Sequence, residues 1–159
     1  MKTFQTTHRV NHSADEMFAL VADIERYPEF VPLCKALRIR TRDTSKEDGD
    51  EILIADMTVA YKLFSETFTS RVTLNRENRT IRVEYLDGPF NHLDNRWTFT
   101  DTGEHESEID FFIAYELKSM SLQLLLGGMF DQAFGKFSEA FEKRADTVYG
   151  IDSHTSSPA

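Results

Sequence analysis

The residue types that most often carry out chemistry are spread thinly along this 159-residue sequence. None of the five histidines, at positions 8, 12, 92, 105 and 154, belongs to a His-x-His or His-Glu-x-x-His metal-binding motif. The sequence also lacks a Gly-x-Ser-x-Gly nucleophile elbow, a phosphate-binding glycine loop and a dinucleotide-binding fingerprint. We therefore expect neither a metal site nor one of the common hydrolase or nucleotide-binding sites.

Cys34 is the single cysteine, which excludes an internal disulfide and a cysteine-rich zinc site. It could be a nucleophile only with a neighbouring base, so we favour the role of a small buried hydrophobic residue. Glu106, Glu108 and Asp110 alternate along a predicted strand and therefore share one face. We interpret that face as solvated, because it would form an acid–base site only if it pointed into a cavity.

Three stretches combine apolar side chains with residues that stiffen or bend the backbone. Residues 27–34 hold two prolines among large apolar groups, residues 88–93 form a glycine–proline turn with an aromatic ring, and residues 122–130 hold a leucine run and two glycines. In a chain with 13 phenylalanines, these stretches could gather at one mouth of a cavity for a large apolar ligand. The alternative is that they are ordinary core and turn residues.

A few polar residues on or near predicted strands could bind the polar head of such a ligand. Thr67, Ser70, Asn95 and Arg96 are the candidates, and one or two of them facing inward would be enough. The pattern alone does not show which of the four face a cavity.

The chain is acidic, with a net charge of −9, which argues against broad binding of nucleic-acid phosphates. Arg38, Arg40 and Arg42 alternate along one predicted strand and would form a single basic stripe. Such a stripe is usually a solvated strand face, although it could also contact anionic lipid headgroups or RNA. No apolar run approaches the roughly 18 residues of a membrane-spanning helix, and residues 1–10 do not resemble a signal or transit peptide. We therefore expect a protein of the reducing cytoplasm.

Hydrophobic periodicity predicts the elements that must position these residues. Strand-like alternation occurs at residues 1–10, 35–42, 52–61, 63–74, 81–85, 93–99 and 109–115, with turns that include residues 101–103. A capping box at Ser13 and Glu16 predicts a helix after the first strand, and residues 25–34 should form a short helix or a bent segment. Apolar residues spaced by three or four from 119 to 149 predict one long amphipathic helix, with Ser119 or Ser121 at its start and Gly150 at its end.

Short turns between consecutive strands predict an antiparallel sheet. The expected fold is α+β, with a seven-stranded curved sheet wrapped around the long C-terminal helix and two short helices between the first two strands. Residues 1–149 should form this single domain, and residues 150–159 a disordered tail. Gly127 and Gly128 interrupt the long helix, either for close contact with the sheet or to make a bendable segment at a ligand entrance or membrane surface.

Two of these motifs carry a family resemblance. Residues 27–34, Tyr-Pro-Glu-Phe-Val-Pro-Leu-Cys, resemble the Y-P-x-F-x-P-x-C signature of the coenzyme Q-binding proteins of the START-like polyketide cyclase superfamily. Gly88, Pro89 and Phe90, with Leu93 and Trp97, resemble their G-P-F-x-x-L-x-x-x-W segment. The order of elements is also similar over residues 1–148, and this branch includes a ribosome-association toxin group.

The resemblance implies a helix-grip fold around a lipid-sized tunnel, with ubiquinone or a similar isoprenoid as the bound ligand and no other cofactor. It implies a lipid chaperone that supports respiration or quinone biosynthesis and is not an enzyme. Such a protein would be cytoplasmic and could contact the inner membrane peripherally. The residues expected to bind the ligand are Tyr27, Phe30, Val31, Pro32, Phe90, Leu93, Trp97, Leu125, Met129, Phe130, Phe134 and Phe137.

Two alternatives stay open. As the toxin-like relatives imply, the chain could bind a ribosomal subunit, and Arg38, Arg40 and Arg42 would then be the contacts. As the superfamily name implies, it could be a polyketide cyclase-type enzyme, which would need an acid–base pair inside the cavity. The sequence does not assign an oligomeric state.

Overall fold

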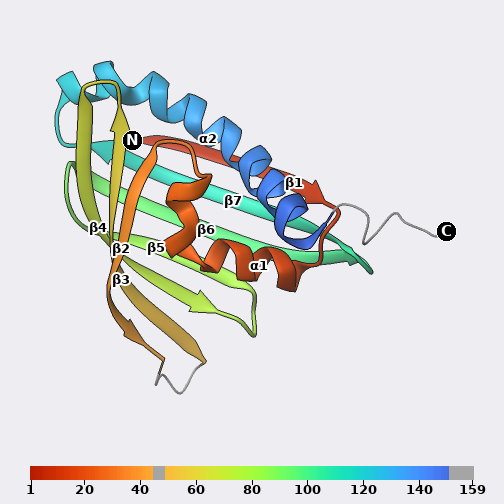
Figure 1. Ribbon diagram of the computed structural model, residues 1–159. Helices are drawn as coiled ribbons and strands as arrows, with labels where there is room; N and C mark the ends of the chain where they lie inside the picture. Colours follow the sequence, from red (N-terminus) through yellow and green to blue (C-terminus); the bar gives the residue numbers. More distant parts are fainter. Residues whose placement is uncertain (45–48, 151–159) are drawn as a thin grey trace.

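In the computed structural model, which describes residues 1–44 and 49–150, seven strands form one antiparallel sheet and a long helix crosses its concave side (Figure 1). The strands are β1 (Lys2–Val10), β2 (Cys34–Asp43), β3 (Asp50–Tyr61), β4 (Phe64–Asn75), β5 (Thr80–Asp87), β6 (Phe90–Gly103) and β7 (Glu106–Leu117). The helices are α1 (Ala14–Ala22), the 3₁₀ helix η1 (Ile24–Glu29) and α2 (Met120–Tyr149). The predicted helix-grip architecture is confirmed. Most of the predicted tail, residues 151–159, lies outside the described residues.

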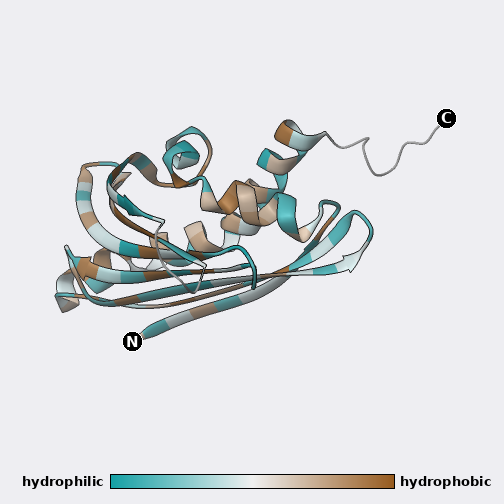
Figure 2. Cartoon of the chain, turned by 90° about the horizontal axis from the view of Figure 1, so that it is seen from below, coloured by the Kyte–Doolittle hydropathy of each residue, from teal (hydrophilic) through white to brown (hydrophobic). Residues whose placement is uncertain are grey.

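The strand order explains why the sheet can enclose one helix. From edge to edge it is β1-β7-β6-β5-β4-β3-β2, so every strand from β2 to β7 pairs with its neighbour in the sequence. β1 closes the other edge by pairing with β7, where Phe4 lies opposite Ile113. Figure 2 shows the sheet as a curved layer with the helical segments gathered on its inner side. The inner face is therefore available for an apolar interior.

One predicted turn is wrong. Residues 101–103 belong to β6, which continues to Gly103 and pairs there with Glu106. The strand register shifts between Asp101 and Gly103, which is the signature of a β-bulge. The bulge lets polar, turn-like residues stay in the strand, so the reversal falls at Glu104 and His105 instead.

Local capping interactions determine where the two α-helices begin. The Ser13 hydroxyl accepts a bond from the Glu16 amide at 3.1 Å, and the Glu16 carboxylate accepts one from the Ser13 amide at 3.0 Å. This is the predicted capping box, and it starts α1. At the start of α2, the Ser119 hydroxyl accepts a bond from the Leu122 amide at 3.0 Å, so Ser119 and not Ser121 is the cap.

The C-terminal half of α2 is fixed to β1 and its following turn by two histidine–carboxylate contacts. His8 Nε2 lies 2.9 Å from Glu142 Oε1, and His12 Nε2 lies 2.7 Å from Asp146 Oδ1. Glu142 and Asp146 are four residues apart and therefore project from the same side of the helix. The last turn departs from the predicted apolar stripe, because Val148 is 51% exposed.

The glycines in α2 do not all serve close packing. A Cβ atom at Gly127 would lie 2.7 Å from the side-chain nitrogen of Gln123, which is the movable end of a side chain on the same helix, whereas a Cβ at Gly128 or Gly135 would meet nothing within 4 Å. Close contact with the sheet therefore does not explain Gly128 or Gly135. Each glycine costs about 1 kcal/mol relative to alanine inside a helix, so the N-terminal half of α2 is intrinsically the less stable half.

The predicted basic stripe of Arg38, Arg40 and Arg42 does not exist as one face. In the strand register, Arg38 lies opposite Asp56 and Arg42 lies opposite Leu53. Asp56 and Leu53 are three residues apart on β3. Cross-strand partners share a face, and residues an odd number apart lie on opposite faces. A register shift between Ile39 and Thr41 causes the change, since a bulge reverses the alternation that the sequence pattern assumed.

Two of these arginines also have acidic partners. Arg40 Nε lies 2.7 Å from Asp56 Oδ2, and the Arg42 guanidinium lies 3.0 Å from Glu51 and 3.6 Å from Glu25. The positive charges of Arg40 and Arg42 are therefore offset by neighbouring carboxylates. Across the described residues, no helix is long and apolar enough to cross a bilayer, and no three potential metal ligands cluster.

Candidate ligand cavity

An apolar cavity of about 120 Å³ lies between the concave face of the sheet, η1 and α2. Its wall consists of inward-facing side chains of β2 to β7, of η1 and the turn that follows it, and of one face of α2. Among the described residues that line it, only Ser70 and Asn95 are polar apart from the Tyr27 hydroxyl and the Trp97 indole N–H. The space is therefore suited to an apolar guest with one or two polar groups.

Nine of the twelve sequence-predicted ligand residues line this cavity. Six of them come from the three stretches singled out in the sequence, which the fold brings together around one space, and the other three lie just beyond those stretches. The nine are Tyr27, Val31, Pro32, Phe90, Leu93, Trp97, Phe130, Phe134 and Phe137. That these side chains bind a ligand stays a prediction, but their convergence on one cavity is observed.

The other three predicted residues lie outside the wall. Phe30 packs behind it, with its ring centroid 5.1 Å from that of Phe141 and the Arg144 guanidinium 5.0 Å from its centroid. Met129 is partly buried against the core without reaching the cavity. Leu125 is 73% exposed, because each residue turns an α-helix by about 100° and only Leu126 of the leucine run faces the sheet. The run is apolar at every position, so its pattern could not show which leucine is buried.

Sequence reasoning missed more than half of the cavity wall. The omitted residues include Leu37, Met57, Phe68, Val72, Ile81, Val83 and Ile113. All of them occupy apolar positions of alternating strands, so the sequence did indicate their inward orientation. Alternation does not distinguish a side chain that packs against another from one that borders empty space.

The structure decides which polar candidates face inward. Ser70 and Asn95 are buried in the cavity wall. Thr67 and Arg96 lie on the outer face, where Thr67 bonds the Thr58 hydroxyl at 2.7 Å and Arg96 bonds Asp94 at 2.8 Å. The difference follows from strand parity, once the register is known.

Asn95 is held in one orientation by two hydrogen bonds. Trp97 Nε1 donates to Asn95 Oδ1 at 2.9 Å, and Asn95 Nδ2 donates to the Phe112 carbonyl oxygen at 2.9 Å. Because an indole N–H can only donate, the Asn95 oxygen must be the atom that faces it. One amide N–H of Asn95 remains, and the Ser70 hydroxyl forms no hydrogen bond with any described residue. The cavity therefore offers two hydrogen-bond donors in an otherwise apolar wall.

The Gly88–Pro89–Phe90 segment positions one end of the cavity. A Cβ atom at Gly88 would lie 2.6 Å from the Phe68 Cβ, so only glycine allows the turn to approach β4 this closely. The Phe90 amide donates to the Tyr85 hydroxyl at 3.1 Å, and the Phe90 ring packs 5.5 Å from that of Phe68. The motif is thus explained by the support it gives to a cavity-lining ring.

Tyr27 in the cavity wall and Cys34 outside it are held in their neutral forms. The Tyr27 hydroxyl donates to the Val21 carbonyl oxygen at 2.5 Å, and burial raises the pKa of Tyr27 well above its usual range. Burial also raises the pKa of the Cys34 thiol to about 11. The carboxylate row of β7 lies on the outer face, where Asp110 accepts a bond from Thr7 at 2.7 Å. The described residues that line the cavity therefore include no charged side chain.

We expect Cys34 to react slowly with iodoacetamide. The ordinary thiol pKa is 9.0, and a value of about 11 leaves roughly 100-fold less thiolate at pH 8. The alkylation rate of the folded protein should rise about tenfold per pH unit up to pH 11. Since the folded pKa is raised, this thiol's contribution to stability is complete below pH 9 and is lost as the pH rises through 11. Mass spectrometry of timed samples would test this, with urea-unfolded protein as the control; equal rates in both would contradict it.

The size of the cavity corrects the expectation of a lipid-sized tunnel. A dry cavity of about 150 Å³ binds a single benzene molecule, and ordinary ligand pockets are about 300–1,000 Å³. A space of about 120 Å³ therefore matches at most one small unsubstituted ring. A substituted quinone ring would require side chains of the wall to move, and a polyisoprenoid tail would have to lie outside the cavity.

The match with a family profile decides the affiliation of this chain. Residues 10–142 match the family described as "Polyketide cyclase / dehydrase and lipid transport". The chain belongs to this family. The superfamily suspected from the two sequence motifs is thereby confirmed, and the helix-grip sheet and C-terminal helix are those of a START-like member.

Two relatives of this family member span most of its length. "Ribosome association toxin RatA" of Rickettsia prowazekii is 35% identical over 153 residues, which cover 93% of this chain and 99% of the relative. "Coenzyme Q-binding protein COQ10 homolog B, mitochondrial" of Xenopus laevis is 30% identical, covering 87% of this chain and 55% of the relative. The solution structure of an 18 kDa protein from Caulobacter crescentus is 30% identical, with a TM-score of 0.77 over 95% of this chain and 100% of that one. The family member is thus similar both to proteins named for ribosome association and to one named for coenzyme Q binding.

Proposed function

We propose that this protein binds the ring of a prenylated quinone, or of a similar apolar lipid, in the cavity between the sheet and α2. The observation that carries the proposal is the wall itself, where aromatic and aliphatic side chains surround the two polar residues Ser70 and Asn95. Burying an apolar ring there removes it from water at about 25 cal/mol per Å². Independent support comes from the Xenopus laevis relative, which is named as a coenzyme Q-binding protein.

The two donors suit a quinone ring. Quinone carbonyl oxygens only accept hydrogen bonds, and the free hydroxyl of Ser70 and the remaining Asn95 N–H can donate. Ser70 lies on β4 opposite Tyr85, and Asn95 lies on β6 opposite Val83, so they are two strands and two residues apart across β5, and their backbones are roughly 12 Å apart. A ring with carbonyl groups on opposite sides spans such a distance with one hydrogen bond at each end.

We further propose that the protein carries this ligand without converting it. The described wall residues include no carboxylate, histidine or lysine, and the Tyr27 hydroxyl is already bonded to Val21. A cyclase would need groups that donate and remove protons beside the ring. The cavity supports binding and offers no such pair among these residues.

Trp97 provides a direct test, because it is the single tryptophan and lines the cavity. Titration with a water-soluble, short-tailed ubiquinone should quench its fluorescence saturably, since a quinone ring in contact accepts an electron from the excited indole. Ser70→Ala should weaken binding about three- to tenfold through the loss of one hydrogen bond. Ala55→Leu should abolish it by filling the space, because Ala55 lines the wall at 2% exposure.

Thr67→Ala is the matched control, since Thr67 lies on the same strand as Ser70 but on the outer face. It should leave the quinone affinity unchanged. Saturable quenching that survives in Ala55→Leu would place the ligand elsewhere. A wild-type protein that shows no quenching, and whose organic extract contains no isoprenoid, would refute the proposal.

A second candidate is association with a ribosomal subunit, and the name of the Rickettsia prowazekii relative favours it. The predicted contacts Arg38, Arg40 and Arg42 are poor ones, because the three do not share a face and because Arg40 and Arg42 have acidic partners. On the outer face, the cross-strand pair Arg82 and Arg96 is 50% and 58% exposed. Both arginines contact Asp94, and Arg82 also lies 3.9 Å from Glu84. Co-sedimentation with subunits at low salt, compared between the wild type and an Arg82→Glu/Arg96→Glu variant, tests this candidate.

A further inference from the structure

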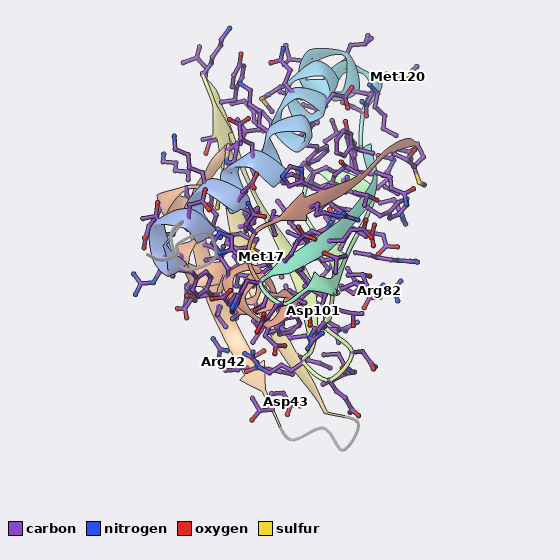
Figure 3. All side chains as sticks on the ribbon, turned by 90° about the vertical axis from the view of Figure 1, so that its right-hand side faces the viewer. Met17, Arg42, Asp43, Arg82, Asp101 and Met120 are labelled. Atoms are coloured by element: carbon purple, nitrogen blue, oxygen red, sulfur yellow. The ribbon has the colours of Figure 1, made fainter. Side chains whose placement is uncertain are left out.

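Two segments that are far apart in the sequence expose large apolar side chains at the same end of the molecule. At the start of α2, Met120, Leu124 and Leu125 are 81%, 85% and 73% exposed. At the turn between β3 and β4, Leu63 is fully exposed and Tyr61 is 40% exposed. Figures 1 and 3 show the β3–β4 turn and the first turn of α2 reaching similar heights at this end, and Figure 3 labels Met120 there. We call these five residues the apolar rim.

The fold itself does not require the apolar rim. Tight turns between strands favour glycine, asparagine and aspartate, yet this one places Lys62 at φ 53° and a leucine beside it. Leu124 and Leu125 face away from the sheet, whereas the neighbouring Leu126 is 2% exposed. Single exposed apolar residues are normal, but a cluster of long apolar side chains on protrusions marks an interaction surface.

The charge around the apolar rim is unlike that of the rest of the chain. Residues 58–65 and 117–130 contain none of the 27 aspartates and glutamates, and their only charged residues are Lys62 and Lys118. Of the carboxylates that flank these two segments, Glu116 lies 3.7 Å from the N-terminal amine and Asp131 lies 3.1 Å from Lys2, whereas Glu66 is exposed one residue beyond the β3–β4 segment. A groove beside the helix start is lined by Lys2, Lys118 and Met120. This end of an acidic protein therefore presents apolar side chains and lysines together.

We propose that the apolar rim inserts into an anionic phospholipid bilayer, with Lys62 and Lys118 contacting the headgroups. Apolar side chains flanked by lysines bind a bilayer interface through buried apolar area and attraction to anionic lipids. A flat, fluid surface can contact both protrusions at once, because they reach similar heights on separate elements (Figure 3). A protein partner would need a matching hollow for each protrusion, whereas a bilayer needs none.

This inference deepens the proposed function, since a lipid carrier must exchange its ligand with a membrane, but it rests on different residues. Leu63, Met120, Leu124 and Leu125 do not line the cavity. Bilayer docking and cavity binding can therefore succeed or fail separately. Quenching of Trp97 reports on the cavity, and vesicle flotation reports on the rim.

Flotation of the purified protein with vesicles tests the docking. Wild-type protein should float with vesicles of phosphatidylcholine and phosphatidylglycerol, and less with phosphatidylcholine alone. Leu124→Ser/Leu125→Ser should lower partitioning about tenfold or more, because two leucines no longer enter the acyl region. Lys62→Glu/Lys118→Glu should lower it only with anionic vesicles, and added salt should weaken wild-type binding.

Val148→Ser is the matched control, since Val148 is 51% exposed at the far end of the same helix. It should float like the wild type, and all variants should keep the wild-type circular dichroism and quinone quenching. Failure of the wild type to float, or equal flotation of the leucine variant, overturns the proposal. Equal binding to neutral vesicles overturns the anionic specificity. Retention on ribosomal subunits that is lost in the leucine variant, without vesicle binding, would assign the rim to the ribosome instead.

Discussion

Replacing Phe141 by alanine should lower the free energy of unfolding by about 3–5 kcal/mol. The Phe141 side chain is 1% exposed, and its ring centroid lies 5.1 Å from those of Trp97 and Phe30. The variant would lose these aromatic contacts and leave a hole between α2 and the sheet. Urea unfolding followed by circular dichroism measures the change.

Leu125→Ala is the control for Phe141→Ala. It removes an apolar side chain of the same helix that is 73% exposed, so the free energy of unfolding should change by about 0.5 kcal/mol or less. A loss below about 1 kcal/mol in Phe141→Ala would show that the ring is not part of the core. Because Phe141 lines the cavity, the variant should also accept a larger ring than the wild type.

Gly88→Ala should cost about 2–4 kcal/mol of stability, for two additive reasons. The backbone at Gly88 has φ 141°, a conformation that residues with a Cβ rarely adopt. The new Cβ would also lie 2.6 Å from the Phe68 Cβ and 2.9 Å from its Cα, so β4 or the turn would have to move. Phe90 follows this turn, and the variant should therefore bind quinone more weakly as well.

Gly128→Ala is the same substitution at another glycine, and it should raise the free energy of unfolding where Gly88→Ala lowers it. Nothing lies within 4 Å of a Cβ at Gly128, and the residue is inside α2, so alanine should raise stability by up to about 1 kcal/mol. Thermal and urea unfolding of the two glycine variants in parallel would separate strain from helix propensity. Similar effects in both variants would mean that the Gly88 turn relaxes without cost.

The cavity and the apolar rim together describe a protein that can hold a ring and meet a membrane. At about 120 Å³, the cavity has room for one small ring and not for a polyisoprenoid tail. The proposed carrier function therefore needs a second apolar environment for the tail. A bilayer beside the rim would supply one, which is why the two proposals reinforce each other while remaining separately testable.

The sequence by itself determined the fold, because local patterns in it agree with the global arrangement. Strand alternation, the Ser13–Glu16 capping box and the 3.6-residue period of residues 119–149 each depend only on neighbours in the chain. The seven strands and both α-helices followed from these patterns, whereas the twelve candidate ligand residues, nine of which line the cavity, came from the family resemblance. The Gly88–Pro89–Phe90 motif also marked a true support of the cavity.

Only the tertiary structure decided what depends on register and on three-dimensional space. A bulge in β2 reversed the side-chain alternation and separated Arg42 from Arg38, which strict alternation could not reveal. The rotation of α2 exposed Leu125 and buried Leu126, although the leucine run is apolar throughout. Strand parity turned Ser70 and Asn95 inward and Thr67 and Arg96 outward. The cavity volume is the small difference between two large volumes, the volume that the sheet and helices enclose and the volume of the side chains that fill it. No local pattern could therefore have predicted it.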